Sequence, residues 1–192
     1  MLRLKNNNQA FTLIEMLIVI AIIGLLSSIV LSTARGAQNK AAASRILSAF
    51  QIVEKGLLAY AIETGQNEWW QDEYFRSFGH STNVNIKIEE ILENLPEVEA
   101  FIPEPPTKPL DNRPIYYDAD IASATGDCGS VGLGVNLIYY TSKIDLVQEV
   151  DKTHDNEDGP NCGTIRYWLQ SNGTDYGVLF RIANDTEELS PI

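Results

Sequence analysis

The chain has 192 residues, which is long enough for one domain with a packed core and an additional element. Its formal net charge is −12. Residues 1–64 carry six basic and three acidic side chains, whereas residues 65–192 carry 8 basic and 23 acidic ones. Such an acidic second part argues against nucleic acid as its partner, because phosphate binding requires a basic surface.

A short polar leader precedes a long apolar segment. Residues 1–10 include Arg3 and Lys5, whereas residues 11–31 contain a single charged side chain, Glu15. At ~1.5 Å per residue a helix of this length spans about 31 Å, close to the hydrocarbon core of a bilayer. The segment therefore predicts a membrane-spanning helix.

Two simple alternatives exist for this segment. One is a permanent membrane anchor, and the other is a secretory signal peptide cut after the small residues Ser32-Thr33-Ala34. The apolar run is longer than the usual signal-peptide core of about 7–15 residues, and a carboxylate near its start is unusual there.

A helical pattern continues beyond the apolar segment. Residues 33–64 contain no proline, and their apolar side chains recur at steps of three and four, as on one face of a helix. The residues of this stripe are Ile46, Phe50, Val53, Leu57 and Ala61, widened by Leu47, Leu58 and Ile62. Four polar residues are expected to face water: Arg45, Gln51, Lys55 and Glu63. We expect one helix from Phe11 to Thr64, ended by Gly65.

The segments after the helix are mixed in character. The aromatic side chains within residues 69–78 are expected to pack in the core, and residues 86–95 are predicted to form a short helix ended by Pro96. Residues 103–114 contain five prolines and must form an extended or turning connection.

The last third of the chain predicts strands. Residues 115–117 and 137–142 are strand-like, as are residues 164–170 and 176–183, which flank Asn172-Gly173. Asn-Gly is the strongest short-range hairpin signal. Asn172-Gly173-Thr174 and Asn184-Asp185-Thr186 also match the N-glycosylation pattern, but the turn accounts for the first without a sugar. These elements predict an α+β fold, with a long N-terminal helix packed on a small antiparallel sheet.

The most specific motif lies at the start of the chain. A basic leader ends at the small residue Ala10, and the apolar helix opens with Phe11-Thr12-Leu13-Ile14-Glu15. This arrangement resembles the leader of type IV prepilins and of type II secretion pseudopilins. Two positions differ from the family: Ala10 stands where a glycine is usual, and Ser32 stands where a proline is frequent.

The resemblance implies a processing reaction and an assembly role. Prepilin peptidase would cut between Ala10 and Phe11, and the new N-terminal Phe11 would be methylated. The new amine could pair with Glu15 of a neighbouring subunit, because a carboxylate within a membrane helix is costly and usually has a partner. The alternative for Glu15 is a position at the headgroup level, where water satisfies it.

The resemblance also gives the two cysteines a role. It places the body outside the cytoplasm, where a pair of cysteines is typically oxidised, so a disulfide between Cys128 and Cys162 is expected. Two unrelated free thiols are the alternative.

Some major pseudopilins bind calcium in a C-terminal loop, and Asp151, Asp155 and Asp158 are weak candidates for such a site. A solvated acidic loop is the favoured explanation for them, and no other cofactor is expected.

We therefore expect four segments: a leader (1–10), a transmembrane assembly segment (11–32), an amphipathic half-helix (33–64) and a globular extracytoplasmic head (65–192). The implied function is that of a structural subunit of a type IV pilus-like filament, serving adhesion, motility or DNA uptake. The alternatives are a type II secretion pseudopilin and, less favoured, a membrane-anchored or secreted binding module.

The implied partners are copies of itself or related pilins, prepilin peptidase, the inner-membrane assembly platform and the lipid bilayer. The implied location is the cytoplasmic membrane, with a single pass, and then a cell-surface or periplasmic filament. No catalytic triad, Cys/His pair or phosphate-binding loop stands out, so no enzyme is expected.

Overall fold

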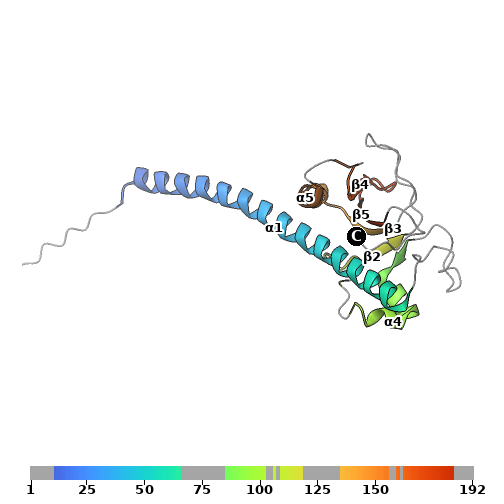
Figure 1. Ribbon diagram of the computed structural model, residues 1–192. Coiled ribbons are helices and arrows are strands. Elements are labelled where there is room, and N and C mark those ends of the chain that lie inside the picture. The colour runs from blue at the N-terminus through green and yellow to red at the C-terminus, as the bar shows by residue number, and fades with distance from the viewer. Residues whose placement is uncertain are drawn as a thin grey trace, which may run out of the picture. The chain divides into compact units, whose positions relative to one another are not determined.

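The computed structural model describes residues 11–65, 85–102, 106, 109–118, 135–155, 159–160 and 162–183. The chain divides into two units, residues 1–38 and 39–192. The helices are α1 (Leu13–Thr64), α3 (Ile88–Asn94), α4 (Pro96–Glu99) and α5 (Ile144–Asp155) (Figure 1). The strands are β1 (Ile86–Lys87), β2 (Ile115–Asp118), β3 (Val135–Thr141), β4 (Ile165–Leu169) and β5 (Tyr176–Ala183).

The part of α1 in the second unit buries one face in the core. All five residues of the predicted stripe, Ile46, Phe50, Val53, Leu57 and Ala61, are buried, which confirms the periodicity. The four polar residues expected to face water are exposed. The exception is Ile62, which is 70% exposed because the buried face ends at its neighbour Ala61.

The sheet is antiparallel throughout, with the strand order β1-β2-β3-β5-β4. Alternate residues of its strands, among them Tyr117, Leu137 and Tyr139, share a core cluster with the buried face of α1. The ring of Phe50 on α1 stacks on Phe180 of β5, with centroids 5.4 Å apart. This arrangement confirms the α+β fold class.

A glycine lets the helix approach its neighbour closely. A side chain at Gly56 would lie 2.9 Å from the carbonyl oxygen of Phe101 and would overlap Ile102. Tyr60, one turn further along α1, meets the Phe101 ring edge-on at 5.7 Å. The residues that follow α4 are therefore pressed against the end of α1.

The segment around Pro96 differs from its prediction. Residues 86–87 pair with β2 as a short strand, and only residues 88–94 are helical. The helix ends before Pro96 as predicted, with Leu95 as its C-cap, but Pro96 also begins α4. Its missing N–H costs nothing there, because the first helical N–H groups have no partner within the helix.

The β4–β5 hairpin is present as predicted, with Gly173 in the left-handed region at φ 71°. The side-chain oxygen of Asn172 accepts hydrogen bonds from the backbone N–H of Thr174 and of Asp175, both at 3.0 Å, and its amide nitrogen donates to the Asp175 carboxylate at 3.1 Å. Asn172 therefore builds the turn, which accounts for its place in a glycosylation pattern. The second such pattern, at Asn184, lies outside the described residues.

Helix α5 is the element that the sequence analysis missed. It includes Asp151 and Asp155, which were expected in a loop. Its buried side chains include Leu146, Val147 and Val150, and it packs against β4 and β5. Three other predicted features lie wholly or partly outside the described residues: the aromatic cluster within 69–78, residues 103–105 and 107–108 of the proline-rich connection, and Cys128.

Candidate functional site

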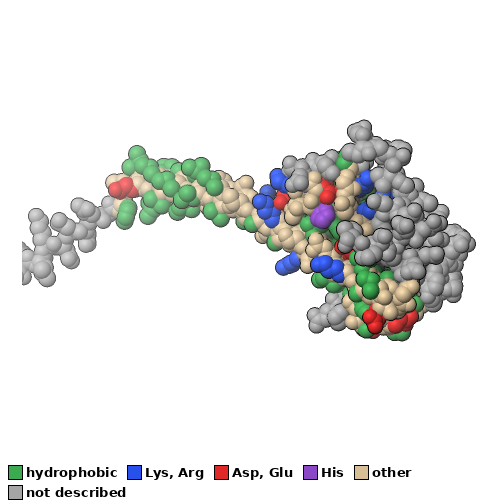
Figure 2. Space-filling view, in the orientation of Figure 1, with side chains coloured by type: hydrophobic (Ala, Val, Ile, Leu, Met, Phe, Trp, Pro, Cys, Tyr) green, Lys and Arg blue, Asp and Glu red, His purple; other side chains and the backbone are tan. Residues whose placement is uncertain are grey.

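The first unit is described from Phe11 to Gln38 and consists of the apolar part of α1. Every large apolar side chain between Phe11 and Leu31 is exposed, from 47% at Val19 to 80% at Leu13. Hydrophobic side chains cover the face of this segment that Figure 2 shows. A helix that is apolar all round cannot be stable in water and requires lipid or other helices around it.

The segment can cross a bilayer by its length and composition. Its most apolar window has a mean hydropathy of 2.7 and none of it is buried within the protein, which separates it from the core helix of a soluble domain. Its hydroxyl groups are satisfied within the helix, since Ser27 donates to the Ile23 carbonyl and Ser28 to the Leu25 carbonyl, both at 2.7 Å. Such bonds lower the cost of placing serine in lipid.

The start of α1 carries a reciprocal cap. The carboxylate of Glu15 accepts hydrogen bonds from the backbone N–H of Thr12 at 2.8 Å and from the Thr12 hydroxyl at 2.7 Å. In return the Thr12 hydroxyl oxygen accepts from the backbone N–H of Glu15 at 3.4 Å. This is a capping box, in which two backbone donors at the start of the helix that have no partner within the helix receive one.

Both bonds from Thr12 end on the same oxygen, Oε2 of Glu15. Among the described residues, none donates to Oε1. The cap therefore fixes the rotamer of Glu15 and presents the second oxygen to its surroundings. Sequence reasoning identified Glu15 but missed Thr12, although the Thr-x-x-Glu spacing is itself the signal for a capping box.

Ala10 lies outside the described residues, and Phe11 is 75% exposed at the chain's first described position. Thr12, which directly precedes α1, and Glu15 in its first turn are joined by the hydrogen bonds of the capping box.

Two of the three candidate calcium ligands, Asp151 and Asp155, accept hydrogen bonds from backbone N–H groups of the protein. Asp151 is 3% exposed and accepts from the backbone N–H of Gly159 at 3.4 Å, and Asp155 accepts from the backbone N–H of Ile165. Burial, and then the charge of Asp151, raise the pKa of Tyr167. Both carboxylates thus hold the connection between α5 and β4.

Asp158 lies outside the described residues, and within the described part no group of three or more potential ligands is arranged around one point. Since Cys128 is outside the described part, the Cys128–Cys162 pairing stays a prediction.

Comparison with known proteins identifies the N-terminal segment. Residues 5–31 match the prokaryotic N-terminal methylation motif, which is the prepilin-type leader of type IV pilins and pseudopilins. Comparison with curated proteins and with solved structures gave no significant match. The matched family is defined by a processing motif and not by an enzymatic site.

Proposed function

We propose that this chain, which carries a prepilin-type leader, is a structural subunit of a type IV pilus-like filament. It is stored in the cytoplasmic membrane, cut between Ala10 and Phe11 by prepilin peptidase, methylated at Phe11 and polymerised through its N-terminal helix. The observation that carries the proposal is the opening of α1, where an exposed apolar helix begins with a capped Glu15 that presents one oxygen outward.

The pairing of Glu15 follows from charge balance in an apolar layer. Cleavage creates an α-amine at Phe11, and both this amine and the carboxylate of Glu15 would be costly to keep unpaired among apolar side chains. Contact between the amine of one subunit and the free oxygen of its neighbour's Glu15 removes both costs at once. Since the pair forms in one register only, it sets the axial stagger between neighbouring subunits.

The apolar side chains serve storage and assembly in turn. In the membrane, lipid surrounds the residues from Phe11 to Leu31. Lipid tails are as apolar as leucine, so moving the helix from lipid to contact with other helices changes the burial of apolar surface very little. Association of the helices therefore depends on close packing and on pairs of polar groups. The partners in this step are further copies or related pilins and the inner-membrane assembly platform.

A pseudopilin of a type II secretion system is the second candidate, because the same leader occurs in both families. The two differ in where the filament lies: a pilus extends from the cell surface, whereas a pseudopilus stays in the periplasm. In either case the acidic head, residues 65–192, lies outside the cytoplasm.

The test replaces Glu15 by glutamine, which keeps the shape of the side chain and removes its charge. Loss of one partner from a buried ion pair costs about 3–5 kcal/mol, so we expect at least a ~100-fold drop in filament recovered from the cells. The amount of processed protein in the membrane should not change. Filament in the sheared surface fraction indicates a pilus, and filament in the periplasm alone indicates a pseudopilus.

Glu63→Gln is the matched control, because Glu63 is an exposed carboxylate on the same helix within the second unit. It should assemble as the wild type does. Normal filament yield from Glu15→Gln would rule out the pairing, and equal loss in both variants would show that the effect is not specific to the N-terminal position.

A further inference from the structure

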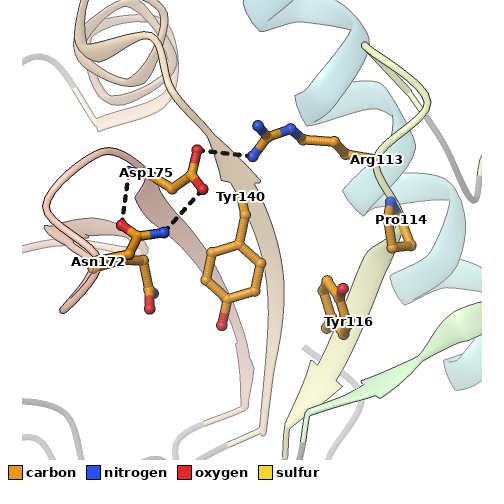
Figure 3. A pocket seen from close by; sticks show the side chains of 7 residues that line it. Arg113, Pro114, Tyr116, Tyr140, Asn172 and Asp175 are labelled. Carbon is orange, nitrogen blue, oxygen red and sulfur yellow. Dashed lines mark hydrogen bonds and ion pairs between the residues drawn. The ribbon is translucent and has the colours of Figure 1, made fainter.

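The second unit contains an open pocket of about 410 Å³ that assembly through the N-terminal helix does not use. Its walls come from three parts of the chain: Arg113 and Pro114 precede β2, Tyr116 and Tyr140 lie on β2 and β3, and the β4–β5 hairpin contributes the remaining residues (Figure 3). The residues of the hairpin are Gln170, Asn172 and Asp175.

One wall of the pocket is a polar bridge between two turns. Nη1 of Arg113 donates to Oδ1 of Asp175 at 3.0 Å, and the Asn172 amide donates to Oδ2 of the same carboxylate at 3.1 Å (Figure 3). The carboxylate of Asp175 is therefore held from both sides, and its charge is balanced by the guanidinium.

A strained turn places Arg113 for this contact. The two preceding residues, Asp111 and Asn112, have φ angles of 52° and 57°, in the left-handed region that both residue types tolerate. The backbone N–H of Arg113 closes the turn on the Leu110 carbonyl at 3.0 Å, and Lys143 pairs with Asp111 at 3.1 Å. The geometry of this wall is thus fixed before any ligand arrives.

The pocket also has an aromatic part. Tyr116 and Tyr140 meet edge to face with centroids 5.3 Å apart, and Tyr140 meets Trp168 in the same way at 6.4 Å. The Asn85 amide donates to the Tyr140 hydroxyl oxygen. Trp168 in turn lies against Gly177, where any side chain would overlap the indole. Tyr140 therefore has a fixed ring and a fixed hydroxyl group.

We propose that this pocket binds a neutral saccharide of one or two rings. The C–H faces of a sugar ring pack on rigid aromatic rings, while its hydroxyl groups both donate and accept hydrogen bonds. The pocket matches both requirements, because guanidinium only donates, carboxylate only accepts, and the amide of Gln170 does both. Its volume lies in the range of about 300–1,000 Å³ typical of small-molecule sites.

The charge of the site selects against charged ligands. Arg113 and Asp175 form a neutral pair, so an anionic ligand would meet the carboxylate and a cationic ligand would meet the guanidinium. The proposal concerns the head alone and does not depend on filament formation. Its test therefore uses the unassembled subunit and gives the same answer whether or not the assembly proposal holds.

The experiment uses the full chain in micelles of a detergent without a sugar headgroup. Glucose, galactose, N-acetylglucosamine, maltose, lactose and cellobiose are each titrated, with saturation-transfer NMR to detect contact and calorimetry to measure affinity. We expect at least one to bind with a Kd of about 1 mM, the range of a small, open site. Tyr116→Ala and Arg113→Ala should each weaken it at least ~tenfold.

Two further variants show whether weaker binding comes from the loss of a pocket contact or from a general loss of structure in the head. Tyr116→Phe keeps the ring and should retain binding within about threefold. Lys55→Ala removes an exposed cation on α1, away from the pocket lining and from the Asp111 turn, and should bind as the wild type does.

Three results would overturn the proposal. No contact from any of the six sugars at about 20 mM, well above the expected Kd, would show that the pocket does not take neutral saccharides. Binding that survives both Tyr116→Ala and Arg113→Ala would place the sugar elsewhere on the chain. If sialyllactose, which is anionic, or choline, which is cationic, bound more tightly than the neutral sugars, the ligand of the pocket would be a charged molecule and not a neutral saccharide.

Discussion

Residues 13–38 and residues 39–64 of α1 belong to one helix but differ in what surrounds their apolar side chains. The first stretch is apolar on all sides as far as Leu31 and exposed, whereas the second is apolar on one face, which is buried in the head. The distribution of apolar residues around the helix thus indicates what surrounds it. A helix that is apolar on all sides requires lipid or other helices around it, and a helix that is apolar on one side packs that side against a folded domain. Substitutions in the two stretches should therefore have opposite consequences for folding and for assembly.

The largest expected effect on folding is at Phe50. Its side chain is fully buried and stacks on Phe180, so Phe50→Ala should lower the free energy of unfolding of the head by about 3–5 kcal/mol. Denaturant unfolding in micelles, followed by near-UV circular dichroism, measures this. Ile18→Ala is the matched change in the first stretch, where the side chain is 53% exposed, and it should leave the unfolding curve unchanged.

Glycine-to-alanine substitutions give the next largest contrast, with opposite signs. At Gly56 the added methyl group would overlap Ile102, so overpacking should cost about 1–3 kcal/mol in the stability of the head. At Gly36 nothing lies within 4 Å, so alanine should instead favour the helix by up to about 1 kcal/mol. Amide hydrogen exchange reports both effects, and slower exchange around residue 56 in the Gly56→Ala variant would contradict the close packing.

The smallest effect is expected at Tyr139, whose hydroxyl group donates to the Leu110 carbonyl at 2.8 Å. Tyr139→Phe should cost about 0.5–1.5 kcal/mol at neutral pH.

The size of this effect should change at alkaline pH. Burial, followed by the charge of Asp111, raises the pKa of Tyr139 to about 12, whereas an unfolded tyrosine ionises near pH ~10. The contribution of the buried phenol is therefore fully present below pH ~10 and is lost as the pH rises towards 12. The stability gap between wild type and Tyr139→Phe should shrink over this interval in unfolding curves, and a constant gap would show that the phenol is not protected.

Local patterns in the sequence predicted most of the fold. The stripe from Ile46 to Ala61 and the Asn172-Gly173 hairpin were both predicted, because each depends on neighbours within a few residues. Helix α5 was missed because it contains many charged residues, so that the helical spacing of its few apolar residues was overlooked. These apolar residues are Leu146, Val147 and Val150. The helical start at Pro96 was missed because proline favours the first turn of a helix as much as it ends one.

The two sites differ in how much the sequence shows. Glu15 was predicted, and its partner Thr12 could have been, since both lie in one capping box. The pocket could not have been predicted, because Arg113 and Asp175 are 62 positions apart and meet only once the sheet has formed.

The most direct test of the account is the mass and the N-terminal residue of the protein, purified from cells with and without prepilin peptidase. We expect a chain that begins at methylated Phe11 when the peptidase is present and a chain with an intact leader when it is absent. A chain that begins at Arg35 would instead mean a secreted domain, and an intact Met1 in both cells would mean a permanent membrane anchor. Either of these results would contradict the assembly role of the first stretch of α1.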